Sequence, residues 1–384
     1  MRRIFFASLW LMGCVSISTQ NTLNYTTAVN LNEIQSFDIY QDDDTLHALV
    51  LGLKNHNDRT QTLRYLQSTD NGKHWSDSIE IPYHFSYSLA SRGNYVQLAV
   101  NGKNIVALWQ TQGELPNYGG LVSVYSHDGG KTWQMGKNPA VDNSGDQSHA
   151  DVIADKNGNF HVVWLADPEE NGYQSLRYAR SVDNGESWQP SQKLDDSSCS
   201  CCSNTFAISP DNQLHVFYRD MNPRDMVLFS SNDFGANWQK KETIGKFNWH
   251  FDGCPHVGGA ITFDDNNNFF ASVWTGKPSE SGLYTVNSLT QIPVRISKNA
   301  THSDIVLFDN KLILVWDEMT KDGTGIFVAQ SHDKGMNWSM PHRLSVIGKI
   351  ATHPRIVASE NNTLILWTEK QLKQPNQWAM SWLD

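Results

Sequence analysis

The sequence predicts an all-β protein, a β-propeller of four-stranded antiparallel blades that occupies residues 22–384 as one domain. Two observations predict it. A short turn motif occurs five times along the chain, and the pattern of a hairpin with a strongly apolar second strand occurs seven times. The hairpins recur with a spacing of roughly 50 to 55 residues, which is the length of a propeller blade of four strands. We therefore expect seven blades, with six as the alternative if one hairpin is an insertion.

The turn motif has the skeleton Ser-x-Asp-x-Gly-x-x-Trp. Ser and Asp side chains can bond to neighbouring backbone groups in a turn, and Gly tolerates positive φ. The Trp is a large apolar side chain that can fill the gap between neighbouring sheets. The five copies are Ser68 to Trp75, Ser126 to Trp133, Ser181 to Trp188, Ser231 to Trp238 and Ser331 to Trp338.

The hairpins define the inner half of each blade, because their strands alternate and their turns are rich in Gly, Asn and Asp. The last unit runs out near Leu383, and we expect its outer strand to come from the N-terminal run Leu23 to Leu31. Such pairing of the chain ends would close the ring and remove exposed strand edges. The hairpins are Phe37 to Leu53, Tyr95 to Trp109, Asp151 to Trp164, Thr205 to Tyr218, Ile261 to Trp274, Asp304 to Trp316 and Arg355 to Trp367.

The repeated octapeptide resembles the Asp-box, or BNR repeat, of sialidase-like β-propellers. In that family the box is a fold element on the outer rim, away from the ligand face. The resemblance covers nearly the whole chain after the N-terminal segment and implies architecture, not chemistry. None of the five boxed Asp residues is therefore a catalytic candidate.

The N-terminus reads as an export signal over residues 1–13, with Arg2 and Arg3 before an apolar run. The signal ends in Leu-Met-Gly before Cys14, which looks like a bacterial lipobox with Cys14 as the lipidated residue. Residues 14–21 would then be a polar tether, and a plain cleaved signal is the alternative. We expect a lipoprotein of the cell envelope, facing the periplasm or the surface, that touches the membrane only through its lipid anchor.

The charge balance bears on partners. The formal net charge is −10 and no run rich in Lys or Arg is present. This argues against nucleic acid as a partner. A local Arg cluster can still bind an anion in an acidic protein.

In a propeller the first strand of each blade lines the central channel, so equivalent positions at the strand starts converge. Aligning the hairpins puts His149, His302 and His353 at one such position. Two residues further along stand Asp151, Asp304 and Arg355. These polar side chains predict a ligand site at the channel mouth.

Cysteines enter the same end of two adjacent blades. Cys199, Cys201 and Cys202 precede the fourth hairpin, and Cys254 with His256 precedes the fifth. One interpretation is that exported thiols oxidise to disulfides among Cys199, Cys201, Cys202 and Cys254. The other is a copper or zinc site formed by Cys201, Cys202, Cys254 and the histidines, because thiolate and imidazole ligands suit these metals.

Arginines near the channel could recognise an anion, since guanidinium groups pair bidentately with carboxylates. The candidates are Arg92, Arg219, Arg224 and Arg355. Sialidases bind the substrate carboxylate with three Arg and use a Tyr activated by a Glu. Here the first inner strand, Ser36 to Tyr40, has no Arg, and Tyr95 has no evident Glu partner.

Three functions remain open from the sequence. The first is a binding protein for a metal ion or a small polar or glycan ligand at the channel mouth. The second is an exo-α-sialidase-type glycoside hydrolase. The third is a non-catalytic scaffold for another envelope protein, since loops on a propeller face suit such a role.

Overall fold

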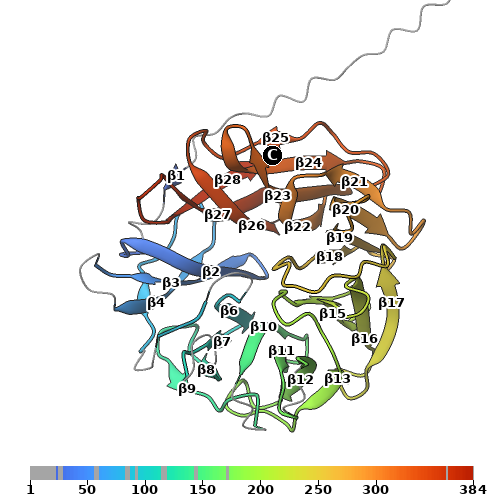
Figure 1. Cartoon of the computed structure of the whole chain (residues 1–384). Coiled ribbons are helices and arrows are strands. Elements are labelled where there is room, and N and C mark those ends of the chain that lie inside the picture. Colours follow the sequence, from blue (N-terminus) through green and yellow to red (C-terminus); the bar gives the residue numbers. More distant parts are fainter. Residues whose placement is uncertain are drawn as a thin grey trace, which may run out of the picture.

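The computed structural model describes residues 23–24, 29–55, 60–82, 87–90, 94–113, 119–141, 146–169, 173–359 and 362–383. The expected signal, tether and Cys14 lie outside these residues, as does Arg92. The described chain is all-β, and it forms seven four-stranded antiparallel sheets. Figure 1 shows these sheets standing as blades around a common centre. The prediction of a seven-bladed propeller is confirmed.

Each of the first six blades uses four strands that are consecutive in the chain. Blades 1 to 3 comprise β2 (Glu33–Asp42), β3 (Thr45–Leu53), β4 (Gln61–Ser68), β5 (Ile79–Glu80); β6 (Gln97–Asn101), β7 (Asn104–Gln110), β8 (Leu121–Ser126), β9 (Gln134–Met135); and β10 (Gln147–Ala154), β11 (Phe160–Ala166), β12 (Ser175–Ser181), β13 (Gln192–Asp195). Blades 4 to 6 comprise β14 (Thr205–Ile208), β15 (Leu214–Arg219), β16 (Met226–Ser231), β17 (Gln239–Ile244); β18 (Ala260–Phe263), β19 (Phe269–Thr275), β20 (Gly282–Asn287), β21 (Val294–Ser297); and β22 (Ala300–Phe308), β23 (Lys311–Thr320), β24 (Gly323–Ser331), β25 (His342–Arg343).

The seventh blade joins the two ends of the chain. It contains β26 (Ile350–Ala358), β27 (Thr363–Lys370) and β28 (Gln377–Leu383), and its outer strand is β1 (Leu23–Asn24). Leu23 pairs with Met380, and Asn24 pairs with Ala379. The ring is therefore closed by an N-terminal strand, as expected.

The core lies between adjacent blades. Leu49 and Leu51 of β3, for example, pack in one cluster with Leu98 of β6 and Trp109 of β7. Trp109, Trp164, Trp316 and Trp367 lie in the second strands of four blades, and each is at most 1% exposed. Burial of apolar side chains on this scale supplies most of the free energy that holds the blades together.

The boxes link each blade to the one before it. In the second blade, Ser126 Oγ donates to Asp128 Oδ1 over 2.8 Å, and the amide of Gly130 donates to Ser126 Oγ over 2.9 Å. The ring of Trp133 packs edge-on against Tyr65 of β4, with centroids 5.3 Å apart. The Trp is thus an inter-blade contact, although Trp133 itself is only partly buried.

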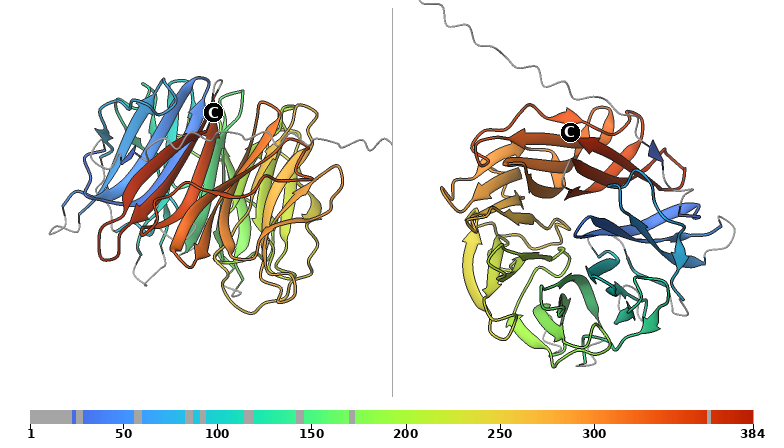
Figure 2. Two further views of the ribbon diagram at one scale, coloured as in Figure 1. Left: turned by 90° about the horizontal axis from the view of Figure 1, so that it is seen from above. Right: turned by 180° about the vertical axis from the view of Figure 1, so that it is seen from behind.

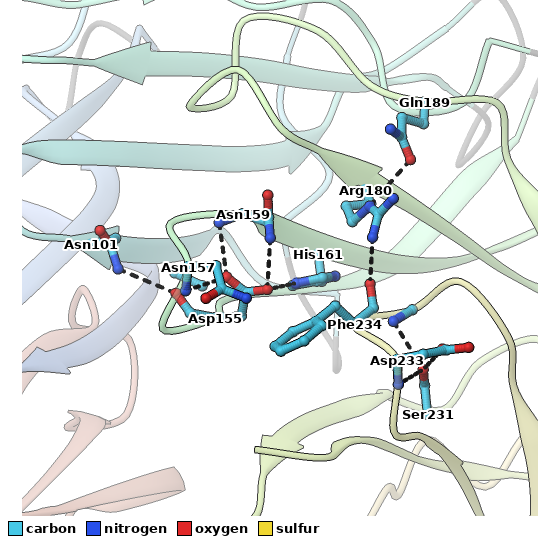
Figure 3. A network of polar contacts seen from close by, with 12 residues as sticks. Asn101, Asp155, Asn157, Asn159, His161, Arg180, Gln189, Ser231, Asp233 and Phe234 are labelled. Atoms are coloured by element: carbon cyan, nitrogen blue, oxygen red, sulfur yellow. Dashed lines mark hydrogen bonds and ion pairs between the residues drawn. The ribbon is translucent and has the colours of Figure 1, made fainter.

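Neighbouring blades are also joined by polar contacts, which Figure 3 shows for blades 2 to 4. Asn101 Nδ2 donates to the carbonyl of Asp155 over 3.2 Å, and Arg180 Nη1 donates to the carbonyl of Phe234 in the next box over 2.9 Å. The side chain of Asp155 holds its own hairpin turn by accepting from the amides of Asn157 and Asn159.

The strand order separates two faces of the ring. Within a four-stranded antiparallel blade, the turn after the first strand and the turn that holds the box lie at one face. The start of the first strand and the connection from the previous blade lie at the other. Figure 2 shows the strands running between these two faces when the ring is seen edge-on. The boxes and the inner-strand starts are therefore on opposite faces.

No helix long and apolar enough to cross a bilayer is present in the described part of the chain.

Candidate functional site

A cavity of about 380 Å³ occupies the centre of the ring. All seven blades contribute to its wall near the starts of their first strands. Five of the six residues aligned from the sequence line this wall, and His149 is the exception. The polar side chains and the glycine at these positions are Ser36, Asp38, Tyr95, Gln97, Asp151, Ser203, Thr205, Gly259, His302, Asp304, His353 and Arg355. We call this space the central cavity.

Arg355 of β26 lies between two carboxylates of the central cavity. Its Nη1 is 3.2 Å from Asp38 Oδ1, and its Nε is 3.3 Å from Asp304 Oδ2. Burial would lower the pKa of Arg355, but the charges of Asp38, Asp304 and Asp151 raise it. The guanidinium therefore stays charged, and carboxylates of the protein already balance it.

Asp151 of β10 is the carboxyl group in the central cavity that is set for proton transfer near neutral pH. Burial within the ring raises its pKa to about 7, although the amide of Phe206 donates to it over 2.6 Å. A carboxyl group with such a pKa is half protonated near neutral pH, which is the condition for a general acid or base.

The cavity carboxylates also have a structural role. Asp38 accepts from the amide of Leu98 over 2.9 Å, and Asp304 accepts from the amide of Ile356 over 3.0 Å. Together with the bond from Phe206 to Asp151, these contacts tie an inner strand to the inner strand of the next blade. Part of the acidic lining is thus explained by the fold alone.

His302 and His353 meet at the wall of the central cavity. Their rings stack with centroids 3.7 Å apart, and His353 also packs edge-on against Tyr95. Asp317 of β23 accepts from His302 Nδ1 over 2.8 Å and from the backbone amide of His353 over 2.9 Å. The Nε2 atom of His353 is buried and has no hydrogen-bond partner among the described residues.

Asp317 is 1% exposed, yet it is charged. Burial would raise its pKa, but the hydrogen bond from His302 and the charges of both imidazoles lower it to about 2. A carboxylate that holds Nδ1–H of a histidine leaves the Nε2 atom available as a base or a metal ligand. The ligand atoms of His302, Asp317 and His353 all lie within 4.8 Å of one another.

A second group of metal-ligand side chains lies where blades 4 and 5 meet, and we call it the sulfur cluster. It consists of Cys199, Cys201, Cys202, Cys254 and His256. Sγ of Cys201, Sγ of Cys254 and a ring nitrogen of His256 lie within 4.8 Å of one another, and so do the sulfurs of Cys199, Cys201 and Cys202. All four cysteines are free thiols, so none of the disulfides considered from the sequence is formed among them.

The chain reaches the sulfur cluster through two connections of the same kind. Cys199 to Cys202 lie between β13 and β14, in a turn where the amide of Cys202 donates to the carbonyl of Cys199 over 3.4 Å. Cys254 and His256 lie between β17 and β18. Both connections run from the outer strand of one blade to the inner strand of the next, so they share the face of the cavity mouth.

Arg219 and Arg224 lie beside the sulfur cluster and do not line the central cavity. Arg219 donates to the carbonyls of Val257, Arg224 and Trp274. Arg224 donates from Nη1 to Cys199 Sγ over 3.1 Å and from Nε to the carbonyl of Phe251 over 2.6 Å. Of the four arginines predicted for anion recognition, only Arg355 is found in the cavity wall, and Arg92 lies outside the described residues.

The surroundings of the three buried thiols shift their pKa values in opposite directions. Hydrogen bonds from Cys201 and Cys202 lower the pKa of the Cys199 thiol, and the charge of Arg219 acts in the same direction. The hydrogen bond to Cys199 raises the pKa of Cys201, and burial raises that of Cys202. Cys199 is therefore the thiol of the group whose ionisation its neighbours favour most.

His149 does not join His302 and His353. Its backbone turns back with φ of 53°, and its amide donates to Asn94 Oδ1 over 3.0 Å. Burial lowers the pKa of His149 to about 4, while the charge of Cys199 raises it and that of His256 lowers it. His149 is thus a buried neighbour of the sulfur cluster. His353 has the same bulge and positive φ in β26, so the backbone at the aligned position does not account for the different surroundings of His149.

Asp317 is the residue that the sequence reasoning missed. It follows Trp316 within the second strand, where five other blades place Gln110, Leu165, Arg219, Thr275 and Thr368 after the matching aromatic residue. An acidic residue at this repeated position was a signal that the alignment offered.

Comparisons with known proteins agree with this architecture. A family model described as a BNR repeat-like domain matches residues 37–273. No curated protein matches the chain in sequence at a significant level.

Several solved structures resemble the chain in fold. A protein of unknown function from Dyadobacter fermentans is 15% identical, with a TM-score of 0.55 over 93% of this chain and 97% of that one. The polysaccharide lyase Uly1 is 10% identical, with a TM-score of 0.60 over 91% and 90%. The sialidase of Trypanosoma rangeli is 13% identical, with a TM-score of 0.52 over 91% of this chain and 54% of that enzyme. Identities this low show the fold alone.

Proposed function

Because the chain belongs to the family of BNR repeat-like domains and its inner-strand starts bring polar side chains together at one face, we propose that it binds a small polar ligand of the glycan class in its central cavity. The observation that supports this most is the convergence of Asp151, His302 and Arg355 on a cavity of about 380 Å³. A concave site with a few converging polar groups and a perturbed carboxyl pKa is the usual form of a ligand pocket.

The charges of the central cavity bear on the class of ligand. Burial raises the pKa of Asp38 and of Asp304, the charge of Arg355 between them opposes that rise, and Asp151 adds further negative charge as it ionises. An anionic ligand would meet a wall with more carboxylates than cations, which costs free energy at short range. The ligand we propose is therefore neutral or cationic, such as a neutral or amino-bearing sugar.

A sialidase-type reaction receives little support from this wall. Such a reaction needs three guanidinium groups around the substrate carboxylate. The guanidinium groups of Arg219 and Arg224 donate hydrogen bonds to backbone carbonyls and to Cys199 Sγ. The likeness in fold to a sialidase and to polysaccharide lyases does not supply the missing groups. We accordingly propose binding, with Asp151 and the pair formed by His302 and Asp317 as the groups from which any acid–base reaction would proceed.

Calorimetric titration tests the proposal with three probes: a neutral oligosaccharide, a glucosamine oligosaccharide and N-acetylneuraminic acid. We expect binding of a neutral or amino sugar, weakened about 10- to 100-fold in Arg355→Met and Asp151→Asn, because each loses a charged hydrogen-bond partner. Asp333→Asn, in a box on the opposite face, is the control that keeps full affinity. Preferential binding of N-acetylneuraminic acid would refute the charge argument.

A second candidate function is the binding of a copper or zinc ion through cysteine and histidine. The sulfur cluster favours it, because thiolate and imidazole ligands from two blades meet there without forming a disulfide. Metal analysis of protein purified under reducing conditions tests this candidate. A stoichiometric metal content that falls in Cys254→Ser supports it.

The setting that we propose for both functions is the cell envelope. It rests on the apolar N-terminal run and Cys14, which predict export and lipid anchoring. Acyl labelling of the wild-type protein, lost in Cys14→Ser, is the measurement that decides it. A scaffold role for another envelope protein stays an alternative for the same face.

A further inference from the structure

The sulfur cluster consists of two overlapping sets of three ligands, and Cys201 belongs to both. One set is Cys199, Cys201 and Cys202, and the other is Cys201, Cys254 and His256. In each set the ligand atoms lie within 4.8 Å of one another. The arrangement therefore has two centres with one sulfur in common, and it differs from a single four-ligand cage.

The spacing of the sulfurs fits metal chelation. Cys199 Sγ and Cys201 Sγ are 3.7 Å apart. Two thiolates bound to one ion at about 2.3 Å lie roughly 3.8 to 4.0 Å from each other in tetrahedral or trigonal geometry. A covalent disulfide would bring the sulfurs to about 2.05 Å. The thiols thus already stand at nearly the distance that a shared ion would impose.

One atom of the second set lacks a partner. The Nδ1 atom of His256 is buried and makes no hydrogen bond with any described residue. A buried polar atom without a partner costs free energy, so such atoms in native structures call for an explanation. A bound ion within reach of Cys201, Cys254 and His256 would satisfy it.

The surroundings of the cluster suit a charged, soft centre. Cys199, Cys201 and Cys202 are at most 6% exposed, whereas Cys254 lies at the surface and leaves a way in. Arg224 donates to Cys199 Sγ over 3.1 Å, and the charge of the buried Arg219 helps to lower the pKa of the Cys199 thiol. Two guanidinium groups therefore offset the negative charge that several thiolates would bring into the interior.

We propose that the sulfur cluster holds two copper(I) ions bridged by the sulfur of Cys201, an inference that rests on the copper or zinc candidate above. Soft thiolate ligands select copper(I), which accepts three ligands readily. Four sulfurs and one imidazole give each of two ions three ligands when one sulfur is shared. Zinc prefers four ligands in a tetrahedron. Two zinc ions would need more ligands than this cluster has.

The test uses the full-length chain, reduced and handled without oxygen, in a Cys14→Ser background so that only cluster thiols are counted. Copper(I) is supplied from its bicinchoninate complex, and bound copper is measured by elemental analysis after gel filtration. We expect two equivalents in the parent protein and in Ser200→Ala, a control in the exposed middle of the same turn. Circular dichroism verifies that every variant is folded.

The variants separate the two ions. Cys201→Ser removes the bridge and should reduce bound copper from two equivalents to below about one, because each remaining set has only two ligands. Cys254→Ser and His256→Ala should each remove one equivalent, and Cys202→Ser should remove the other. The double variant Cys202→Ser/Cys254→Ser should bind less than either single variant, which shows that the losses are independent.

Three outcomes overturn the inference. One equivalent of copper, insensitive to Cys202→Ser but lost in Cys254→Ser, keeps the metal candidate and removes the second ion. One equivalent of zinc that excludes copper(I) from the reduced protein also keeps the candidate and refutes the choice of metal. Failure to bind either metal, with all four thiols free to react after denaturation, refutes the candidate and the inference together.

Discussion

The imidazole rings of His302 and His353 stack at 27° with their centroids 3.7 Å apart, although the residues belong to different blades and lie far apart in sequence. Asp317 holds the pair, since it accepts from the side chain of one and from the backbone of the other. Two rings this close cannot both be charged at low cost. Burial lowers the pKa of His353, and the charge of His302 lowers it further.

We expect the ring of His353 to stay neutral at ordinary acidic pH, because burial first and the charge of His302 second lower its pKa to about 3. The unfolded chain binds a proton at this residue below about pH 6.5. The contribution of neutral His353 to the free energy of unfolding should thus be fully present above that pH and decrease as pH decreases toward 3. NMR titration of the imidazole signals measures the pKa of His353, and a His353 signal that titrates near pH 6.5 would contradict the structure. In Asp317→Asn the pKa of His353 should decrease further, since the favourable charge is gone.

Asp151 should respond to pH with the opposite sign. Burial raises its pKa in the folded protein to about 7, so the folded state keeps a proton that the unfolded state loses near pH 4. Ionisation therefore destabilises the fold as pH increases from 4 to 7. Asp151→Asn should match the wild type at pH 4 and exceed its unfolding free energy by about 1–3 kcal/mol at pH 8. Denaturant unfolding at the two pH values checks this, and equal stabilities at pH 8 would count against it.

Two neighbouring glycines of the second box form a matched pair for testing the contact between blades. Both have positive φ, 74° at Gly129 and 83° at Gly130. A Cβ on Gly129 would meet nothing within 4 Å, whereas one on Gly130 would lie 2.0 Å from the ring of Tyr65. Gly129→Ala should cost about 1–2 kcal/mol from the backbone alone. Gly130→Ala should cost about 1–3 kcal/mol more, because Tyr65 must move. Thermal unfolding measures both, and equal losses would show that the box does not press on the preceding blade.

Arg224 should control the ionisation of Cys199. Its Nη1 donates to Cys199 Sγ over 3.1 Å, and hydrogen bonds to a charged group favour the charged form. Arg224→Met should lower the ratio of thiolate to thiol at Cys199 about tenfold in the reduced protein at neutral pH. Thiolate ultraviolet absorbance gives this ratio, and Lys241→Met, an exposed site, serves as the control. An unchanged absorbance in folded Arg224→Met would place the thiolate elsewhere in the cluster.

The sequence predicted the blades well because their signals are repeated. Five boxes and seven hairpins set the register of the strands, and that register correctly placed Asp304, His353 and Arg355 in one wall. The pairing of β1 with β28 was also predictable, since the last unit lacks an outer strand.

Single residues that depart from the repeat were harder to place. His149 occupies the aligned position and shares its bulge and positive φ with His353, yet only His353 lines the central cavity. Arg219 and Arg224 follow an inner strand, as an anion site would require, yet their guanidinium groups bond to the protein itself. The position of the charged end of a long side chain depends on which hydrogen-bond partners lie near it in the folded protein. A pattern of residue types in the sequence does not contain that information.

Closure of the ring by β1 also has a consequence for how the chain is made. Leu23 is synthesised among the first residues of the fold, and its partner Met380 is synthesised among the last. The strand pair at the outer edge of the seventh blade can therefore form only after nearly all of the described chain has been translated. This pair joins segments that lie very far apart in the sequence. Such a contact contributes the most to loop-closure entropy and delays completion. A chain truncated before β28 would leave the edge of β27 open to other molecules.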